Sequence, residues 1–495
     1  MSTETQAQPT PPASDKLDKR VLMVAGVVVL GAIMSILDIT VVSVALQTFQ
    51  TEFDATTAQV AWTMTGYTLA LASVIPLTGW AADRFGTKRL YLLALGLFTA
   101  GSVLCATANS LEMLVAFRVI QGLGGGMLMP LGMTILTRAA GPERVGRVMA
   151  VLGIPMLLGP IFGPILGGAL IDSASWHWIF LINLPIGIAA FAYAGVVLPK
   201  DHVEPSETFD WVGMLLLSPG LALFLFGISS IPQAKQEHGT VWTAQVVGPA
   251  VIGALLIVAF VPWALRRSNI HPLVDLRLFK NRTMTVAVLA MSLFAISFFG
   301  ASLLFPLYFQ SVRGEDALHA GLLLAPQGIG AMITMPIAGV LADRIGPGKI
   351  VMTGITVITI GMAMFTQLEV DTSYAYLLTA LFIMGLGMGS TMMPIMSAAL
   401  ATLKPATIAR GSTLMNIVQQ VSASIGTALF SVLLTNGLIG LDPSDPATYI
   451  PGQVDAFATV FTVATILIAC VLIPAAFLPR TKVAHPVDPA LLVGH

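Results

Sequence analysis

The sequence predicts an all-α polytopic membrane protein with fourteen transmembrane helices, arranged as two six-helix bundles and a two-helix insert. Three observations predict this fold. The 495 residues have a mean hydropathy of +0.86 and are only 10% charged, whereas charged residues make up about 25% of a typical soluble domain. Fourteen apolar runs follow one another along the chain, and a glycine-containing motif occurs twice, 260 residues apart.

Each apolar run is long enough to cross about 30 Å of hydrocarbon, which takes roughly 20 helical residues. Residues 1–20 precede the first run and are polar, so we expect an N-terminal tail rather than a cleaved signal peptide. The first seven runs lie near residues 22–46, 58–82, 89–108, 111–136, 144–170, 177–198 and 211–231. The other seven lie near residues 242–265, 284–311, 317–341, 349–367, 373–401, 410–436 and 454–478.

The basic residues test this helix count independently, because Lys and Arg accumulate on the cytoplasmic side of a membrane. With the N-terminus inside, only three of the 24 Lys and Arg residues fall elsewhere: Lys235 and Arg313 in outer loops, and Arg118 within a helix. One miscounted helix would move every later loop to the other side. We therefore expect a multi-pass protein of the cytoplasmic (inner or plasma) membrane with both termini cytoplasmic.

The repeated motif divides the chain into related halves, as in many transporters. It closes the second run at Gly79 and the tenth run at Gly339. The predicted parts are a cytoplasmic N-terminal tail (1–20), an N-terminal six-helix bundle (21–200), a two-helix insert (201–266), a cytoplasmic linker (267–283), a C-terminal six-helix bundle (284–479) and a cytoplasmic tail (480–495).

Asp38 is the only ionisable residue between Val21 and Leu46. A carboxylate in hydrocarbon is costly, so we expect it to face a protein interior or a wet cavity and to mark a functional site. Arg118 lies at a similar depth in the fourth run, which makes a direct or water-bridged pair with Asp38 feasible. Such an arginine favours the ionised carboxylate, whereas burial favours the protonated form. The alternatives are a carboxyl group that only holds two helices together, or a static buried pair.

The repeated loops predict an inner gate. A glycine lets two helices approach closely, a second glycine allows a tight turn, and the carboxylate can meet a helix N-terminus or nearby cations. A plain basic topology loop is the alternative. The gate residues are Gly79, Asp83, Arg84, Gly86, Lys88, Asp343 and Arg344.

The fourth, fifth and thirteenth runs supply the other candidate residues. Glycines spaced four apart predict a smooth packing face, and prolines predict a bend; ordinary small-residue packing is the alternative. Uncharged amides elsewhere suit either a cavity wall or hydrogen bonds between helices. Methionines suit either a deformable cavity lining or a core or lipid-facing position. The helix candidates are Gly159, Pro160, Gly163 and Pro164, and the cavity candidates are Gln121, Met127, Asn416 and Gln420.

Five segments together resemble the signatures of the major facilitator superfamily, specifically its fourteen-helix drug:proton antiporters of the EmrB/QacA type. They are residues 37–46, 79–89, 118–122, 153–168 and 176–187. The resemblance covers essentially the whole chain. It implies the superfamily fold, a proton-coupling role for Asp38 and Arg118, and an antiporter role for the fifth helix. The chain departs from the usual residues at Ser43, Gln47 and His177, which bears on cargo more than on mechanism.

The sequence thus predicts a proton-coupled secondary transporter that exports drugs or other amphiphilic or cationic hydrophobic compounds by alternating access. No P-loop is present, so an ion gradient is the expected energy source. The alternative is export of an endogenous lipid, siderophore or metabolite. We expect a small substrate, protons and the lipid bilayer as partners, with no nucleic acid, cofactor or metal and no enzymatic activity; an accessory export protein is left open.

Overall fold

The computed structural model describes residues 18–141, 144–200, 208–267, 269–404, 407–439, 441–442 and 444–481, and these residues form helices and connections without a strand. The first part of the chain contains α1 (Lys19–Glu52), α2 (Thr57–Phe85), α3 (Thr87–Ala106), α4 (Leu111–Ala140), α5 (Val145–Ser173), α6 (Trp178–Leu181) and α7 (Asn183–Val197). The middle contains α8 (Trp211–Ser229), α9 (Ile231–His238), α10 (Ala244–Leu265) and the 3-10 helix η2 (Leu276–Lys280).

The last part contains α11 (Arg282–Ser302), α12 (Leu304–Ser311), α13 (Ala317–Leu323), α14 (Ala325–Ile345), α15 (Pro347–Met364), η3 (Phe365–Gln367), α16 (Tyr374–Gly389), α17 (Met392–Ala401), α18 (Ile408–Leu438), α19 (Pro446–Cys470) and α20 (Leu472–Ala475). Within the described part of the chain, thirteen spans are long and apolar enough to cross a membrane. Helix α5, with 29 residues, brings the number to the predicted fourteen.

Several spans are interrupted where a proline removes a backbone donor. A proline cannot donate to the carbonyl four residues earlier, so the helix tends to end there. Helices α6, α11 and α19 end at Leu181, Ser302 and Cys470, each four residues before a proline. The interruption after Leu181 bears on the candidate site described below, because α7 begins directly after it, at Asn183.

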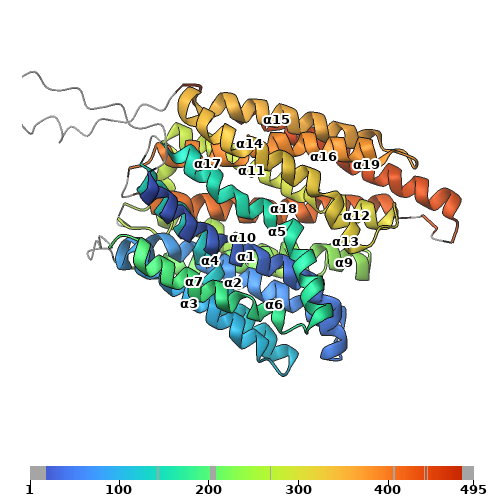
Figure 1. Ribbon diagram of the computed structural model, residues 1–495, viewed down its shortest axis with the longest axis horizontal. Helices are drawn as coiled ribbons and strands as arrows, with labels where there is room; N and C mark the ends of the chain where they lie inside the picture. Colours follow the sequence, from blue (N-terminus) through green and yellow to red (C-terminus); the bar gives the residue numbers. More distant parts are fainter. Residues whose placement is uncertain are drawn as a thin grey trace, which may run out of the picture.

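The two related halves lie side by side along their length (Figure 1). Helices α1 to α7 pack mainly on one another, as do α11 to α20. The insert helices α8 and α10 form a pair, and α8 also packs on α2 and α18, so that it touches both halves. The exact boundaries of the predicted parts remain a prediction.

Glycines on α4 and on α3 allow α4 to pack closely between α2 and α3. A Cβ atom at Gly126 would lie 2.6 Å from the carbonyl oxygen of Leu71 on α2, and one at Gly101 would lie 2.7 Å from the Gln121 backbone. Real Cβ atoms do not approach so closely, so only glycine permits this packing. This packing carries Arg118 and Gln121 into the centre of the N-terminal half.

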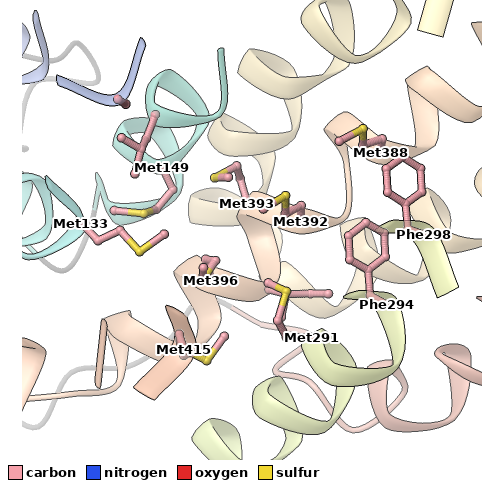
Figure 2. Packing of buried hydrophobic residues seen from close by; sticks show 14 of the residues in the cluster. Met133, Met149, Met291, Phe294, Phe298, Met388, Met392, Met393, Met396 and Met415 are labelled. Atoms are coloured by element: carbon pink, nitrogen blue, oxygen red, sulfur yellow. The ribbon is translucent and has the colours of Figure 1, made fainter. Parts of the chain in front are cut away.

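Methionines fill much of the contact between the halves. Met133 and Met149 from the N-terminal half face thioether side chains of the C-terminal half, with Phe294 and Phe298 deeper in that half (Figure 2). All of these side chains are buried, which favours the core interpretation over an open cavity wall. Thioethers are flexible and polarizable, so this contact can be remade at small cost when the halves move. The facing methionines are Met291, Met392, Met393, Met396 and Met415.

The linker after the insert packs against the helices. Leu273, Val274 and Leu278 are buried in the main hydrophobic cluster, whereas Phe279 is exposed. Asp210 contributes to this packing, because it accepts hydrogen bonds from the α8 backbone, from Trp263 on α10 and from the linker backbone at Leu273. The linker is therefore held against the protein.

Candidate functional site

Asp38 and Arg118 form a buried ion pair in the N-terminal half. Nη1 of Arg118 donates to Oδ2 of Asp38 at 2.5 Å, and the Asp38 side chain has no exposed surface. Nε of Arg118 donates to the carbonyl oxygen of Thr63 on α2 at 3.1 Å. The pairing therefore joins α1, α2 and α4, and it agrees with the equal depths inferred from the sequence.

Gln121 completes a closed ring with this pair. Its Oε1 accepts from Nη1 of Arg118 at 2.7 Å, and its Nε2 donates to Oδ1 of Asp38 at 2.7 Å. The ring continues outward, because Nε2 of Gln121 also donates to Oγ of Ser102, and Nδ2 of Asn183 donates to the same oxygen, at 2.8 and 2.9 Å. Gln121 and Ser102 are fully buried, and Gln121 belongs to the polar network; its role in a substrate cavity stays a prediction.

Aromatic rings enclose the guanidinium group. The carbon Cζ of Arg118 lies 4.2 Å from the centre of the Tyr67 ring and 5.8 Å from that of Phe180. The Tyr67 hydroxyl is 3.3 Å from Oγ of Ser35, one turn from Asp38 on α1. Cation–π contacts strengthen when water is excluded. The rings thus help to hold a charge where solvent does not reach.

The glycine face of α5 lies directly behind Asp38. A Cβ atom at Gly159 would collide with Ile36 on α1, one at Gly163 with Thr40, and one at Gly167 would crowd Val41. The side chains of Pro160 and Pro164 lie outside the described residues, although their backbone belongs to α5. Helix α5 therefore backs the stretch of α1 that carries the carboxylate.

The other end of α5 meets the gate motif of the opposite half. Oδ1 of Asp343 accepts from the backbone N–H of Gly146 at 2.9 Å, and Oδ2 accepts from that of Arg147 at 3.3 Å. The Nε atom of Arg147 lies 3.5 Å from Oδ2. A carboxylate at a helix N-terminus is stabilised by unpaired N–H groups and by the helix dipole. We call this end of the molecule, where α2 and α14 finish, the gate end.

Asp83 holds the equivalent place in the first gate motif. Arg138 lies 3.3 Å from its Oδ1, and Arg410, at the start of α18 in the other half, lies 3.5 Å from its Oδ2. A Cβ atom at Gly79 would press on Thr413 and Arg410 of α18. Asp83 therefore connects the two halves through Arg410.

The remaining gate residues shape the turns that follow. Gly86 and Gly346 have φ angles of 93° and 94°, which favour glycine because other residues clash there. Nζ of Lys88 donates to the carbonyl oxygens of Gly195 and Leu198 at the end of α7. Arg84 is half-buried in the last turn of α2, and Arg344 occupies the matching turn of α14.

The predicted cavity residues do not converge on one site in this structure. Met127 is buried in the main hydrophobic cluster. Nδ2 of Asn416 donates to the Ser412 carbonyl oxygen and lies 3.2 Å from the Met133 sulfur atom, across the contact between the halves. Gln420 is half-buried on α18. Their role in cargo binding remains a prediction.

The structure also adds residues that sequence reasoning did not single out. Ser102, Asn183 and Tyr67 are uncharged groups in apolar runs, and a scan for every buried polar residue would have flagged them. For Arg138 and Arg410, the sequence predicts only a location on the cytoplasmic side. Among the described residues, no three His, Cys, Asp or Glu side chains gather into a metal-binding group.

Comparison with known proteins agrees with this architecture. The family model described as Major Facilitator Superfamily matches residues 28–427. The chain is 49% identical to the Multidrug resistance protein B homolog of Mycobacterium tuberculosis, covering 96% of this chain and 93% of that protein. It is 33% identical to the Multidrug export protein EmrB of Escherichia coli, covering 82% and 79%.

Two solved structures share the fold at low sequence identity. The human organic anion transporter MFSD10 (TETRAN) superposes with a TM-score of 0.61 at 16% identity, covering 93% of this chain and all of that one. The proton:xylose symporter XylE gives 0.58 at 15% identity, covering 93% and 96%. The match of the family model and the close relatives establish that this chain belongs to the Major Facilitator Superfamily of membrane transporters.

Proposed function

We propose that this protein is a proton-coupled secondary transporter that exports drugs or other amphiphilic or cationic hydrophobic compounds by alternating access. The observation that carries the proposal is the fully buried Asp38–Arg118 pair in an otherwise apolar helix bundle. A carboxylate within a membrane costs free energy, so its presence there indicates a function. Two relatives are named a multidrug resistance protein and a multidrug export protein, and these names support drugs as the proposed substrates.

Asp38 is the proposed proton site. Its ionised form is stabilised by Arg118 and Gln121, while complete burial favours the neutral form. These opposed influences allow a modest rearrangement of the surroundings to change which form is preferred. Arg118 is the proposed tuner, because any movement of α4 relative to α1 changes its distance from the carboxylate.

Helix α5 is the proposed connection between proton binding and gating. Its glycine face packs on α1 around Asp38, and its N-terminus holds Asp343 of the other half. Gly146 and Gly163 are 17 residues apart, which is about 25 Å along a helix. A shift of α1 on protonation would therefore be felt at the gate end through one rigid element.

The proposed location is the cytoplasmic membrane, with the gate end and both termini on the cytoplasmic side. The distribution of Lys and Arg supports this orientation. The contacts of Asp83 and Asp343 between the halves would then close the cytoplasmic side. Cargo released from this state would leave on the opposite side.

Transport by the purified protein in sealed proteoliposomes tests the proposal. An imposed pH gradient should drive movement of fluorescent lipophilic cations, and a proton ionophore should abolish it. Asp38→Asn should lose proton-driven exchange, whereas Asp445→Asn, which changes an exposed loop carboxylate, should keep it. Full proton-driven exchange by Asp38→Asn would contradict the proton site.

The chemistry of the cargo is tested in the same vesicles. A panel should combine lipophilic cations with neutral amphiphiles, a phospholipid, a siderophore and polar metabolites. Broad acceptance of the apolar and cationic compounds is expected. Transport of one endogenous compound with rejection of the lipophilic cations would instead establish the narrower exporter.

A further inference from the structure

The hydrogen bonds around Asp38 leave no place for an additional proton. Arg118 can only donate, so Oε1 of Gln121 must face it, and the amide nitrogen Nε2 must then face Asp38 and Ser102. Both hydrogens of Nε2 are used in this way. Oγ of Ser102 accepts two bonds, from Gln121 and from Asn183.

Protonation of Asp38 would place two donors opposite each other. Neither Nε2 of Gln121 nor Nη1 of Arg118, the two groups that contact the carboxylate oxygens, can accept a hydrogen bond from a protonated carboxyl group. Turning the Gln121 amide over would satisfy Oδ1 but would put Nε2 against the guanidinium group. A buried donor without an acceptor is expensive, so the observed arrangement suits the ionised carboxylate alone.

Ser102 and Asn183 hold the Gln121 amide in this orientation. Ser102 offers an oxygen on the side away from Arg118, and Asn183 fixes that oxygen as an acceptor at 2.9 Å. The backbone keeps Ser102 in place, because the neighbouring Gly101 lies against the Gln121 backbone with no room for a Cβ atom. All three polar residues are buried.

Asn183 also marks the interruption between α6 and α7. It is the first residue of α7, and the break is set by Pro185. The centre of the Phe180 ring, on α6, lies 5.8 Å from Cζ of Arg118. The segment from Phe180 to Asn183 therefore contacts the polar network at two points.

We propose that Ser102 and Asn183 are positioning residues for the proton step: they orient the Gln121 amide towards ionised Asp38 and connect that orientation to the break between α6 and α7. The proposal rests on the proposed function, because it takes Asp38 as the proton site. The other titratable or charged groups facing Asp38 are Arg118 on α4, Tyr67 on α2 and Cys105 on α3. Proton uptake by Asp38 removes an acceptor from Nε2 of Gln121, and the Ser102–Asn183 contact connects this change to the start of α7.

Infrared titration of the purified protein tests the proposal without requiring transport. The carboxyl C=O band that disappears in Asp38→Asn reports protonated Asp38, and its pH midpoint is the measured quantity. Ser102→Ala and Asn183→Leu should move the midpoint to higher pH, because the ionised carboxylate loses oriented donors. Ser102→Thr keeps the hydroxyl group and should restore a midpoint near that of the wild type.

A matched control and a second assay separate the possible outcomes. Ser218→Ala removes a buried hydroxyl group of the insert and should leave the midpoint unchanged. A wild-type midpoint in folded Ser102→Ala would overturn the proposal; this variant loses one oxygen atom and decides the matter if Asn183→Leu does not fold. Shifted midpoints in a protein without proton-driven transport would support the positioning role and reject the proposed function.

Discussion

At the scale of single residues, the burial of Asp38 and Arg118 makes each dependent on the other. The pair has almost no exposed surface, so neither charge is compensated by water. Breaking a buried pair by removing one partner typically costs about 3–5 kcal/mol, whereas replacing both by apolar groups costs much less. A comparison of single and double variants can therefore measure the stability cost of an unpaired charge at this site.

Arg118→Leu should lower the midpoint of thermal unfolding in detergent more than the double variant Asp38→Leu/Arg118→Leu does. The single variant leaves an unpaired buried carboxylate, whereas the double variant leaves only the Gln121 amide to find partners. Differential scanning fluorimetry of both variants and of Asp38→Leu gives the comparison. A double variant that loses as much stability as the two single variants together would mean that the residues act independently.

The sequence predicts this pair but not its neighbours. A charge in an apolar run is conspicuous, and counting residues along a helix places Asp38 and Arg118 at one depth. Ser102 and Asn183 carry no charge, and such residues occur singly in many membrane helices. Their connection depends on how α3, α4 and α7 pack, which depends in turn on Gly101 and the break at Pro185.

At the scale of secondary-structure elements, Asp210 joins the insert to the linker. It accepts from the Gly213 backbone on α8, from the Trp263 indole on α10, and from Asn269 and Leu273 in the linker. Arg277 donates to the carbonyl oxygen of Arg266, which directly follows α10, and to that of Asn269 in the linker. One carboxylate thus anchors three segments near the gate end.

Asp210→Ala should release the linker from the insert. Four donors lose their acceptor, and each buried donor left unsatisfied costs about 1–3 kcal/mol. Hydrogen–deuterium exchange should rise in peptides covering residues 269–281, and that of α2 should change little. Asp210→Asn keeps one acceptor oxygen and should give an intermediate increase. Unchanged exchange in Asp210→Ala would mean that apolar burial of Leu273 and Val274 alone holds the linker.

The sequence predicts the positions of the helices well, because the length of each apolar run can be counted directly along the chain. The helix ends are harder to predict where a helix continues beyond the membrane as a polar turn. Helix α19 begins at Pro446, with Asp445 accepting from the Ala447 backbone, whereas the apolar run begins near residue 454. Capping and proline at the first turn favour this early start.

At the scale of the whole molecule, the gate motif of each half meets the corresponding helix of the other half. Asp343 contacts the start of α5, and Asp83 contacts Arg410 at the start of α18. Helices α5 and α18 are the fifth and thirteenth predicted spans, separated by the same eight spans as the two motifs. The repeat therefore gives the gate end an approximate two-fold symmetry, in which Asp343 faces backbone donors and Arg147, and Asp83 faces two arginines.

This difference predicts unequal effects of neutralising the two carboxylates. Asp343→Asn keeps an oxygen that can accept from the Gly146 backbone, whereas Asp83→Asn removes the negative charge that both Arg138 and Arg410 approach. Both variants should open the gate end, and Asp83→Asn should open it more. Ser412→Cys provides the probe, because Ser412 on α18 is fully buried and its hydroxyl group contacts Thr134 on α4.

Maleimide labelling of Ser412→Cys, measured on its own peptide by mass spectrometry, should rise from the parent protein through Asp343→Asn to Asp83→Asn. Restoring a closed state requires both contacts, so the double variant should label at least as fast as Asp83→Asn. Asp445→Asn serves as the control for loss of a carboxylate elsewhere. Equal labelling in all these variants would mean that the buried methionines between the halves, rather than the two carboxylates, keep the gate end closed.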